Sequence, residues 1–134
     1  LEENNIEFVF DEKNKFYVYA DEFYIEQAFT NYFTNAIKHV KEVDGKKTIK
    51  VNVEQNGNKV RVSVFNTGEN ISKENMNRIW KRFYKADESR NRADGGSGIG
   101  LALVKAIMNN YNAEYGVVNK EDGVEFYFML EKSK

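Results

Sequence analysis

Six stretches of this chain are rich in aromatic and β-branched residues or alternate apolar and polar positions, and this pattern predicts β-strands. They come in three consecutive pairs, and a short polar segment joins the two members of each pair. The clearest joint is the Asn-Gly-Asn sequence at Asn56–Asn58, a strong hairpin signal. The expected strands are Ile6–Phe10, Phe16–Ala20, Thr48–Gln55, Lys59–Asn66, Glu114–Asn119 and Val124–Glu131.

Three other stretches place apolar residues three and four positions apart, which predicts helices. The first begins after Asp21, a residue type that caps helix N-termini, and is expected to end near Gly45. A short helix is predicted over about Ser72–Trp80, and a third helix ends at about Tyr111. Between these two, Tyr84–Ser97 is polar and charged, and we predict a long mobile loop there.

Strands that follow one another as hairpins predict a mixed, mostly antiparallel sheet of about five strands. About three helices are expected to cover one face of that sheet. The predicted fold class is an α/β (α+β) two-layer sandwich, not a doubly wound parallel sheet. The whole chain, residues 1–134, is expected to form one domain excised from a longer protein.

The composition excludes several functional classes. Lys and Arg number 20 against 21 Asp and Glu, and this net charge of −1 does not favour binding to nucleic acid. The absence of Cys and the presence of one His exclude disulfides, thiolate metal sites and multi-histidine metal sites. No apolar run reaches the roughly 18 residues that a membrane span needs, so we expect no membrane contact by this segment.

The stretch DGGSGIGLALVKAI, at Asp94–Ile107, places glycines directly before an apolar helical pattern. It lacks the G-x-G-x-x-G that follows a strand in dinucleotide-binding folds. It is not a P-loop either, because Leu101-Ala102 replaces the Lys and the hydroxyl residue. Backbone N–H groups at Gly98 and Gly100 nevertheless precede a helix, where they favour anionic oxygens. The alternative is a flexible linker that ends in a helix start.

The first predicted helix carries a polar cluster within NYFTNAIKHV, at Asn31–Val40. Asn31 and Asn35 are four residues apart and share one face, with Lys38 near that face and His39 beside it. Neutral amide oxygens suit Mg²⁺ that is already bound to nucleotide phosphates, and Lys38 can contact a phosphate. The alternative is an ordinary solvated helix face, on which an isolated His packs or meets solvent.

The segment VFNTGENI, at Val64–Ile71, follows a predicted strand and precedes a short helix. Asn66 ends the strand, and Gly68 can adopt the backbone conformation that a tight turn needs. The amide of Asn66 can read the edge of an adenine ring. Asn and Gly are also common turn residues, so a plain strand-to-helix turn is the alternative.

Four segments stand in a fixed order along the chain: NYFTNAIKH, VFNTGENI, IWKRFYKAD and GGSGIGLALVKAIM. Together they resemble the N, G1, F and G2 boxes of sensor histidine kinases, and the resemblance covers about Ile6–Leu130. It implies the Bergerat ATP-binding fold of the GHKL superfamily, with ATP and Mg²⁺ as cofactors. It also implies the catalytic ATP-binding (HATPase_c) domain of a two-component sensor histidine kinase.

The resemblance implies roles for individual residues. Asn35 would ligate Mg²⁺, Asn31 would lie close to the metal and the reacting phosphate, and Lys85 would reach the terminal phosphate. Tyr84–Ser97 would be the ATP lid. The implied ATP-binding residues are Asn35, Lys38, His39, Asn66, Gly68, Ile71, Phe83, Gly96, Gly98, Gly100 and Leu101.

Two positions depart from the family pattern D-x-G-x-G: Asn66 replaces the Asp, and Asn70 replaces the second Gly. Asn66 can still accept a hydrogen bond from the adenine amino group, although without the charge that strengthens such bonds. ATP binding is therefore expected to persist, and a weakened affinity is left open. Asn70 leaves the turn geometry open, although Asn tolerates a left-handed conformation better than most residues.

ATP-hydrolysing members of the superfamily usually carry a Glu four residues before the metal-binding Asn, and Asn31 stands there instead. An amide cannot act as a general base, which favours transfer of the phosphate to another nucleophile over hydrolysis. In histidine kinases the acceptor His lies in a separate domain, and the single His of this chain, His39, lies in the implied ATP pocket. Phosphorylation of His39 itself is the disfavoured alternative.

We therefore expect the chain to bind Mg·ATP and to transfer its γ-phosphate to a His on the dimerisation and phosphoacceptor domain of the same kinase. A response regulator is the expected downstream partner. We expect the segment to be cytoplasmic and monomeric, and its parent to be a membrane-anchored homodimer. Two other interpretations stay open: another GHKL ATPase or Ser kinase, and a degenerate nucleotide-binding module without catalysis.

Overall fold

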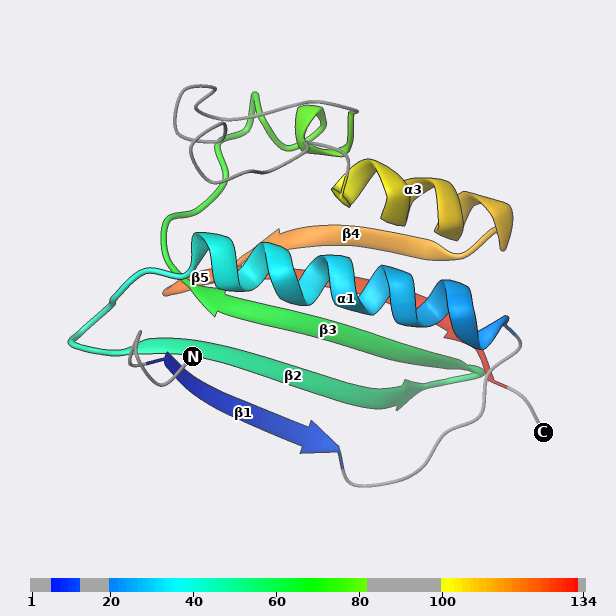
Figure 1. The fold of residues 1–134 in the computed structure, drawn as a ribbon, viewed down its shortest axis with the longest axis horizontal. Helices are drawn as coiled ribbons and strands as arrows, with labels where there is room; N and C mark the ends of the chain where they lie inside the picture. The colour runs from blue at the N-terminus through cyan, green and yellow to red at the C-terminus, as the bar shows by residue number, and fades with distance from the viewer. Residues whose placement is uncertain (1–5, 13–19, 82–99, 133–134) are drawn as a thin grey trace.

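The computed structural model describes residues 6–12, 20–81 and 100–132. One five-stranded sheet, with strand order β1-β2-β3-β5-β4, carries both α-helices on the same face (Figure 1). The two-layer α/β architecture predicted from the sequence is confirmed. The elements are β1 (Ile6–Glu12), α1 (Glu22–His39), β2 (Lys47–Asn56), β3 (Lys59–Thr67), η2 (Arg78–Trp80), α3 (Gly100–Asn110), β4 (Glu114–Asn119) and β5 (Gly123–Glu131).

The sheet is mixed, as predicted, but one strand pair differs from the hairpin pattern. β2, β3, β5 and β4 pair antiparallel, whereas β1 runs parallel to β2, with Phe8 opposite Ile49. The expected partner of β1, Phe16–Ala20, falls outside the described residues except for Ala20, which lies in a bend. Parallel neighbours need a crossover connection, and α1 supplies it between β1 and β2.

The prediction of a short helix over Ser72–Trp80 is wrong for most of these residues. Successive turns cover residues 73–77, and only Arg78–Trp80 form a 3₁₀-helix, so the described residues hold two α-helices rather than about three. A helix this short is marginal unless packing supports it. Trp80 is the buried residue of η2, and it packs edge-on against Tyr115 with ring centroids 4.9 Å apart.

The centre of α1 lies directly on the sheet. Ala28, Tyr32 and Ala36 recur every fourth residue and are at most 1% exposed. The small alanines let the helix approach closely, and the Tyr32 hydroxyl donates a 2.9 Å hydrogen bond to the Tyr127 carbonyl oxygen. Burial raises the pKa of Tyr32 well above its usual value, so this hydroxyl stays protonated and remains a donor.

Both ends of α1 are set by identifiable hydrogen bonds. Asp21 is the predicted N-cap, and its Oδ1 accepts from Phe23 N at 2.9 Å. The helix ends at His39 and not near Gly45, because Lys41 N turns to the Thr67 carbonyl oxygen at 2.9 Å. Gly45 does take a left-handed conformation, with φ +82°, but in a separate tight turn.

The two α-helices run in opposite directions over the sheet (Figure 1). The N-terminal end of α1 meets the C-terminal end of α3, where Asp21 N donates to the Tyr111 hydroxyl at 2.9 Å. α3 ends in a Schellman motif: Asn112 has φ +53°, and Ala113 N donates to the Met108 carbonyl oxygen at 2.8 Å. The N-terminal end of α3 therefore points towards the second half of α1.

Strands β3 and β5 approach closely at Gly123, which pairs with Thr67. A Cβ atom at Gly123 would overlap the Asn66 carbonyl oxygen. We expect Gly123→Ala to lower the free energy of unfolding by about 1–3 kcal/mol, because backbone rather than a flexible side chain would have to move. Chemical denaturation measures this.

Gly100→Ala is the matched control, because no atom of the described residues lies within 4 Å of a Cβ there. We expect it to change the free energy of unfolding by less than about 0.5 kcal/mol. Equal stabilities for the two variants would contradict the close approach of β3 and β5.

Candidate functional site

The second half of α1 and the turn after β3 are far apart in sequence but touch in the structure. Lys41 N donates to the Thr67 carbonyl oxygen, and a Cβ at Gly68 would lie 3.2 Å from the His39 carbonyl oxygen. Gly68 has φ +148°, a conformation that side chains rarely adopt. The two polar segments that the sequence singled out therefore form one continuous surface.

Asn66 lies at the end of β3 on the face that the helices cover. It is 3% exposed and sits between Ile49 of β2 and Val124 of β5. Its Nδ2 donates to the Thr67 carbonyl oxygen at 3.0 Å. Among the described residues no hydrogen bond to its Oδ1 is found, so this oxygen is the end of the amide suited to accept from a ligand.

Asn31 and Asn35 lie on one flank of α1. Phe29 and Phe33 occupy the opposite flank, where Phe33 stacks on Phe8 of β1 at 5.8 Å. At about 100° per residue, Asn31 and Asn35 turn away from β1 and towards the side on which α3 packs. Both asparagines are half-buried, whereas Lys38 and His39 near the end of the helix are exposed.

The side chain of Asn31 has an unusual environment. Its Nδ2 is buried and has no hydrogen-bond partner among the described residues. An amide N–H buried without a partner costs about 1–3 kcal/mol, so such a group needs an explanation. A bound polar ligand would satisfy it.

The third element of the candidate site is the start of α3, at Gly100. The helix is roughly 16 Å long at 1.5 Å per residue. Measured back from the contact between Asp21 and Tyr111, this length brings Gly100 level with the middle of α1. Helix N-termini favour anions, and Leu101 packs half-buried against the core just inside this end.

Eight of the predicted site residues lie on α1, on the end of β3 with its turn, and at the start of α3. They are Asn31, Asn35, Lys38, His39, Asn66, Gly68, Gly100 and Leu101. Ile71 follows the same turn and packs half-buried against the core. The other predicted residues, Phe83, Lys85, Gly96 and Gly98, and the predicted loop Tyr84–Ser97 lie outside the described residues.

Sequence reasoning missed Asn119, the last residue of β4. Its Oδ1 accepts from Ile71 N and its Nδ2 donates to the Ile71 carbonyl oxygen, both at 2.9 Å. The available signal was weak: an amide side chain at the end of a strand, beside a hairpin. Asn is common at such places for local reasons, so the sequence alone gave no ground to connect it with residue 71.

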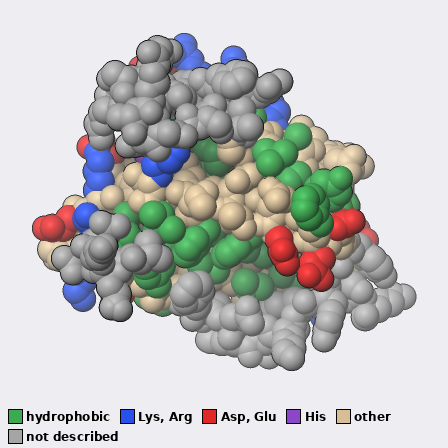
Figure 2. Space-filling view, in the orientation of Figure 1, with side chains coloured by type: hydrophobic (Ala, Val, Ile, Leu, Met, Phe, Trp, Pro, Cys, Tyr) green, Lys and Arg blue, Asp and Glu red, His purple; other side chains and the backbone are tan. Residues whose placement is uncertain are grey.

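Two hollows lie away from these residues. One, of about 430 Å³, is on the sheet face without helices, and the other, of about 360 Å³, lies beside the first half of α1 and is lined by Ile25, Phe29, Val62 and Phe128 among others. Hydrophobic side chains are visible along α1 in Figure 2, and at its start Phe23 and Tyr24 are 61% and 45% exposed.

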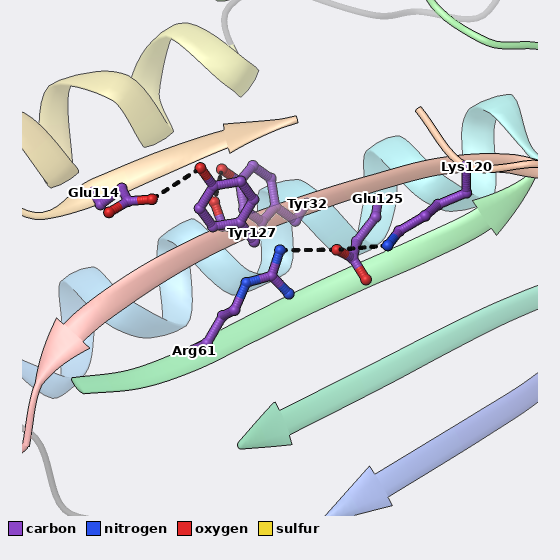
Figure 3. A network of polar contacts seen from close by, with 6 residues as sticks. All are labelled: Tyr32, Arg61, Glu114, Lys120, Glu125 and Tyr127. Atoms are coloured by element: carbon purple, nitrogen blue, oxygen red, sulfur yellow. Dashed lines mark hydrogen bonds and ion pairs between the residues drawn. The ribbon is translucent and has the colours of Figure 1, made fainter. Parts of the chain in front are cut away.

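On the sheet face without helices, polar side chains form a row across β3 and β5 (Figure 3). Arg61 pairs with Glu125 at 2.9 Å and its guanidinium lies 4.4 Å from the centre of the Tyr127 ring. Burial, followed by the hydrogen bond to Glu114, raises the pKa of Tyr127. The row joins neighbouring strands on the face opposite the two helices.

Comparison with known proteins identifies the family of this chain. Residues 20–134 match the model of the histidine kinase-, DNA gyrase B- and HSP90-like ATPases. The sensor protein VanSB of Enterococcus faecalis is 32% identical over 96% of this chain and 28% of its own length. The sensor histidine kinase CusS of Escherichia coli K12 is 33% identical over 87% of this chain and 24% of its own length.

Solved structures of histidine kinases also resemble this chain. The catalytic domain of histidine kinase ThkA superposes with a TM-score of 0.82 at 31% identity, covering 98% of this chain and 82% of that domain. A structure of ThkA in complex with the response regulator protein TrrA gives a TM-score of 0.74 at 30% identity, covering 98% of this chain and 36% of that one.

The chain belongs to the histidine kinase-, DNA gyrase B- and HSP90-like ATPase family. Its relatives place it among the ATP-binding catalytic domains of two-component sensor histidine kinases. It spans about a quarter of the length of the curated relatives that it matches. Within residues 6–12, 20–81 and 100–132, no helix has the length and apolar character that crossing a membrane requires.

The contact between Gly68 and the end of α1 can be tested by adding one methyl group. We expect Gly68→Ala to lower the free energy of unfolding by about 1–3 kcal/mol, because alanine is strained at this φ and its Cβ would press on the His39 carbonyl. Amide exchange at Lys41 should accelerate, since its N–H bonds to the adjacent Thr67 carbonyl. Denaturation and hydrogen exchange measure the two effects.

Glu69→Ala is the neighbouring control. Glu69 forms an ion pair with Lys41 at 3.1 Å, but its side chain is 82% exposed. Exposed pairs contribute little, so we expect a change of less than about 1 kcal/mol. If Gly68→Ala behaved like this control, the close contact at Gly68 would be refuted.

Proposed function

We propose that this chain binds Mg·ATP across the second half of α1, the turn Asn66–Ile71 and the start of α3. From there it would present the γ-phosphate to a histidine on a separate dimerisation and phosphoacceptor domain of the same kinase. One observation carries the proposal: the asparagine flank of α1 ends directly on the turn that holds Asn66. Phosphate-binding and base-reading groups are thereby fixed relative to one another.

The residues on α1 suit a nucleotide-bound Mg²⁺. The side-chain oxygens of Asn35 and Asn31 are neutral, hard ligands, and the buried, unpartnered Nδ2 of Asn31 supports a polar occupant beside it. The proposed ligands of the ion are these amide oxygens and the phosphate oxygens of the nucleotide. When bound, Mg²⁺ neutralises charge on the phosphates.

The remaining roles divide between the two ends of the nucleotide. Asn66 would accept a hydrogen bond from the adenine amino group, Gly68 and Ile71 would shape the pocket around the ring, and His39 would flank the adenine or ribose. At the phosphate end, Lys38 would act as a point charge beside the backbone at Gly100 and Leu101. By similarity to the family, Phe83, Lys85, Gly96 and Gly98 would complete this end.

The side chains present favour transfer over hydrolysis. Asn31 occupies the position from which a Glu would activate water, and an amide cannot take up that proton. The chain itself would contribute positioning and charge neutralisation, which dominate phosphoryl transfer. The His39 backbone lies beside Gly68, and a role for His39 in the proposed pocket supports an acceptor histidine on another domain.

The wider setting follows the relatives. We propose that residues 1–134 are a single domain of a longer homodimeric, membrane-anchored kinase, that this domain is itself cytoplasmic and monomeric, and that a response regulator acts downstream. The structure of ThkA with the response regulator protein TrrA supports the last point by similarity.

The metal role of α1 predicts a specific change in nucleotide binding. With Mg²⁺ present, we expect Asn35→Ala to weaken ATP binding at least tenfold, because an Mg²⁺ ligand is lost. Without Mg²⁺, the variant and the unmodified chain should bind ATP to within about threefold. Calorimetric titration with and without Mg²⁺ measures both.

Thr34→Ala is the matched control, since the Thr34 hydroxyl bonds to the Thr30 and Asn31 carbonyl oxygens within the same helix. It should retain the affinity of the unmodified chain in both conditions. No binding of millimolar ATP by the unmodified chain would refute the proposed function. Phosphate transfer from ATP to a supplied dimerisation domain would separate a kinase from a degenerate module, and transfer to a Ser would indicate another GHKL kinase.

A further inference from the structure

The tip of the β4–β5 hairpin, Asn119–Gly123, lies against the turn Asn66–Ile71. At one end of this contact, Thr67 pairs with Gly123 in the sheet, and Gly68 N donates to the Asp122 carbonyl oxygen at 3.0 Å. The absence of a side chain at Gly123 lets the hairpin reach the Asn66 backbone. The hairpin tip thus touches the turn along its whole length.

Asn70, which stands in place of the second glycine of the family pattern, is part of this contact. Its Nδ2 donates to the Lys120 carbonyl oxygen at 3.0 Å and to the Gly123 carbonyl oxygen at 2.9 Å. Asn70 does not have a positive φ. The turn is therefore held here by a side chain that bridges two carbonyls, and not by the conformational freedom of a glycine.

Asn119 holds the other end of the turn. It forms a two-bond pair with the backbone N–H and carbonyl of Ile71, each bond 2.9 Å long. Among the described residues, Glu69–Ile71 make no backbone–backbone hydrogen bond, because β3 ends at Thr67 and the next turn begins at Ser72. Side-chain amides from Asn70 and Asn119 consequently provide the hydrogen bonds that fix this segment.

We infer that Asn70 and Asn119 are positioning residues for the adenine pocket. This rests on the proposed function, in which Asn66 and Ile71 meet the base. Neither asparagine is expected to touch the nucleotide. Asn119 fixes Ile71, Asn70 fixes the backbone just before it, and together they hold the turn in the conformation that receives the ring.

The experiment compares Asn119→Ala and Asn119→Asp with Glu121→Ala in the folded chain. Glu121 lies at the same hairpin tip, and the described part of the structure gives its side chain no hydrogen bond or ion pair. Two quantities are measured: ATP affinity in the presence of Mg²⁺, and hydrogen exchange at the Ile71 amide without nucleotide. The second readout does not depend on ATP binding.

Asn119→Ala should raise the Kd for ATP by about three- to tenfold and accelerate Ile71 exchange by at least about tenfold, because Ile71 loses both partners. Asn119→Asp should protect Ile71 more than Asn119→Ala and less than the unmodified chain, since a carboxylate oxygen can still accept from the Ile71 N–H but cannot donate to the Ile71 carbonyl oxygen. Glu121→Ala should change neither quantity. The aspartate variant also preserves the test if the alanine variant fails to fold.

Normal Ile71 exchange in Asn119→Ala, unchanged ATP affinity in that variant, or Ile71 exchange in Asn119→Asp at least as rapid as in Asn119→Ala would each overturn the inference. The proposed function would stand in all three cases, provided the unmodified chain binds ATP. An unmodified chain that does not bind ATP would overturn the proposed function and this inference together.

Discussion

The hydrogen bond from Lys41 N to the Thr67 carbonyl oxygen joins the end of α1 to the end of β3. Because of it, the helix stops at His39, and the chain enters the turn beside Gly68 without a gap. The rest of α1 is then fixed lengthwise over the sheet, with Tyr32 bonded to Tyr127 on β5. The asparagines on its flank can take only one position relative to Asn66.

Much of the fold could be predicted from local patterns. The alternation of apolar and polar residues placed β2 and β3 to within one residue at each end, because a period of two and an Asn-Gly turn determine both strands and their connection. The parallel pairing of β1 with β2 could not be predicted in this way. Periodicity shows which residues form a strand, but the partner depends on where α1 returns the chain.

The same distinction applies to helix ends and to the candidate site. Asp21 caps α1 with its own side chain, so its role could be predicted, whereas the end at His39 depends on Thr67, far along the chain. The predictions for Asn31, Asn35, Asn66 and Gly68 rest on their residue types and spacing. Asn119 acts on backbone atoms of Ile71, which leave no mark in the sequence.

The hairpin tip has a consequence for how the molecule is made. The turn Asn66–Ile71 lies near the middle of the chain. The residues that Asn70 contacts, Lys120 and Gly123, come some fifty residues later. During synthesis, which proceeds from the N-terminus, α1 and β3 can associate first, but the pocket wall stays unsupported until β4 and β5 have emerged. Under the proposed function, a nucleotide would therefore meet a complete pocket only after the hairpin has joined the sheet.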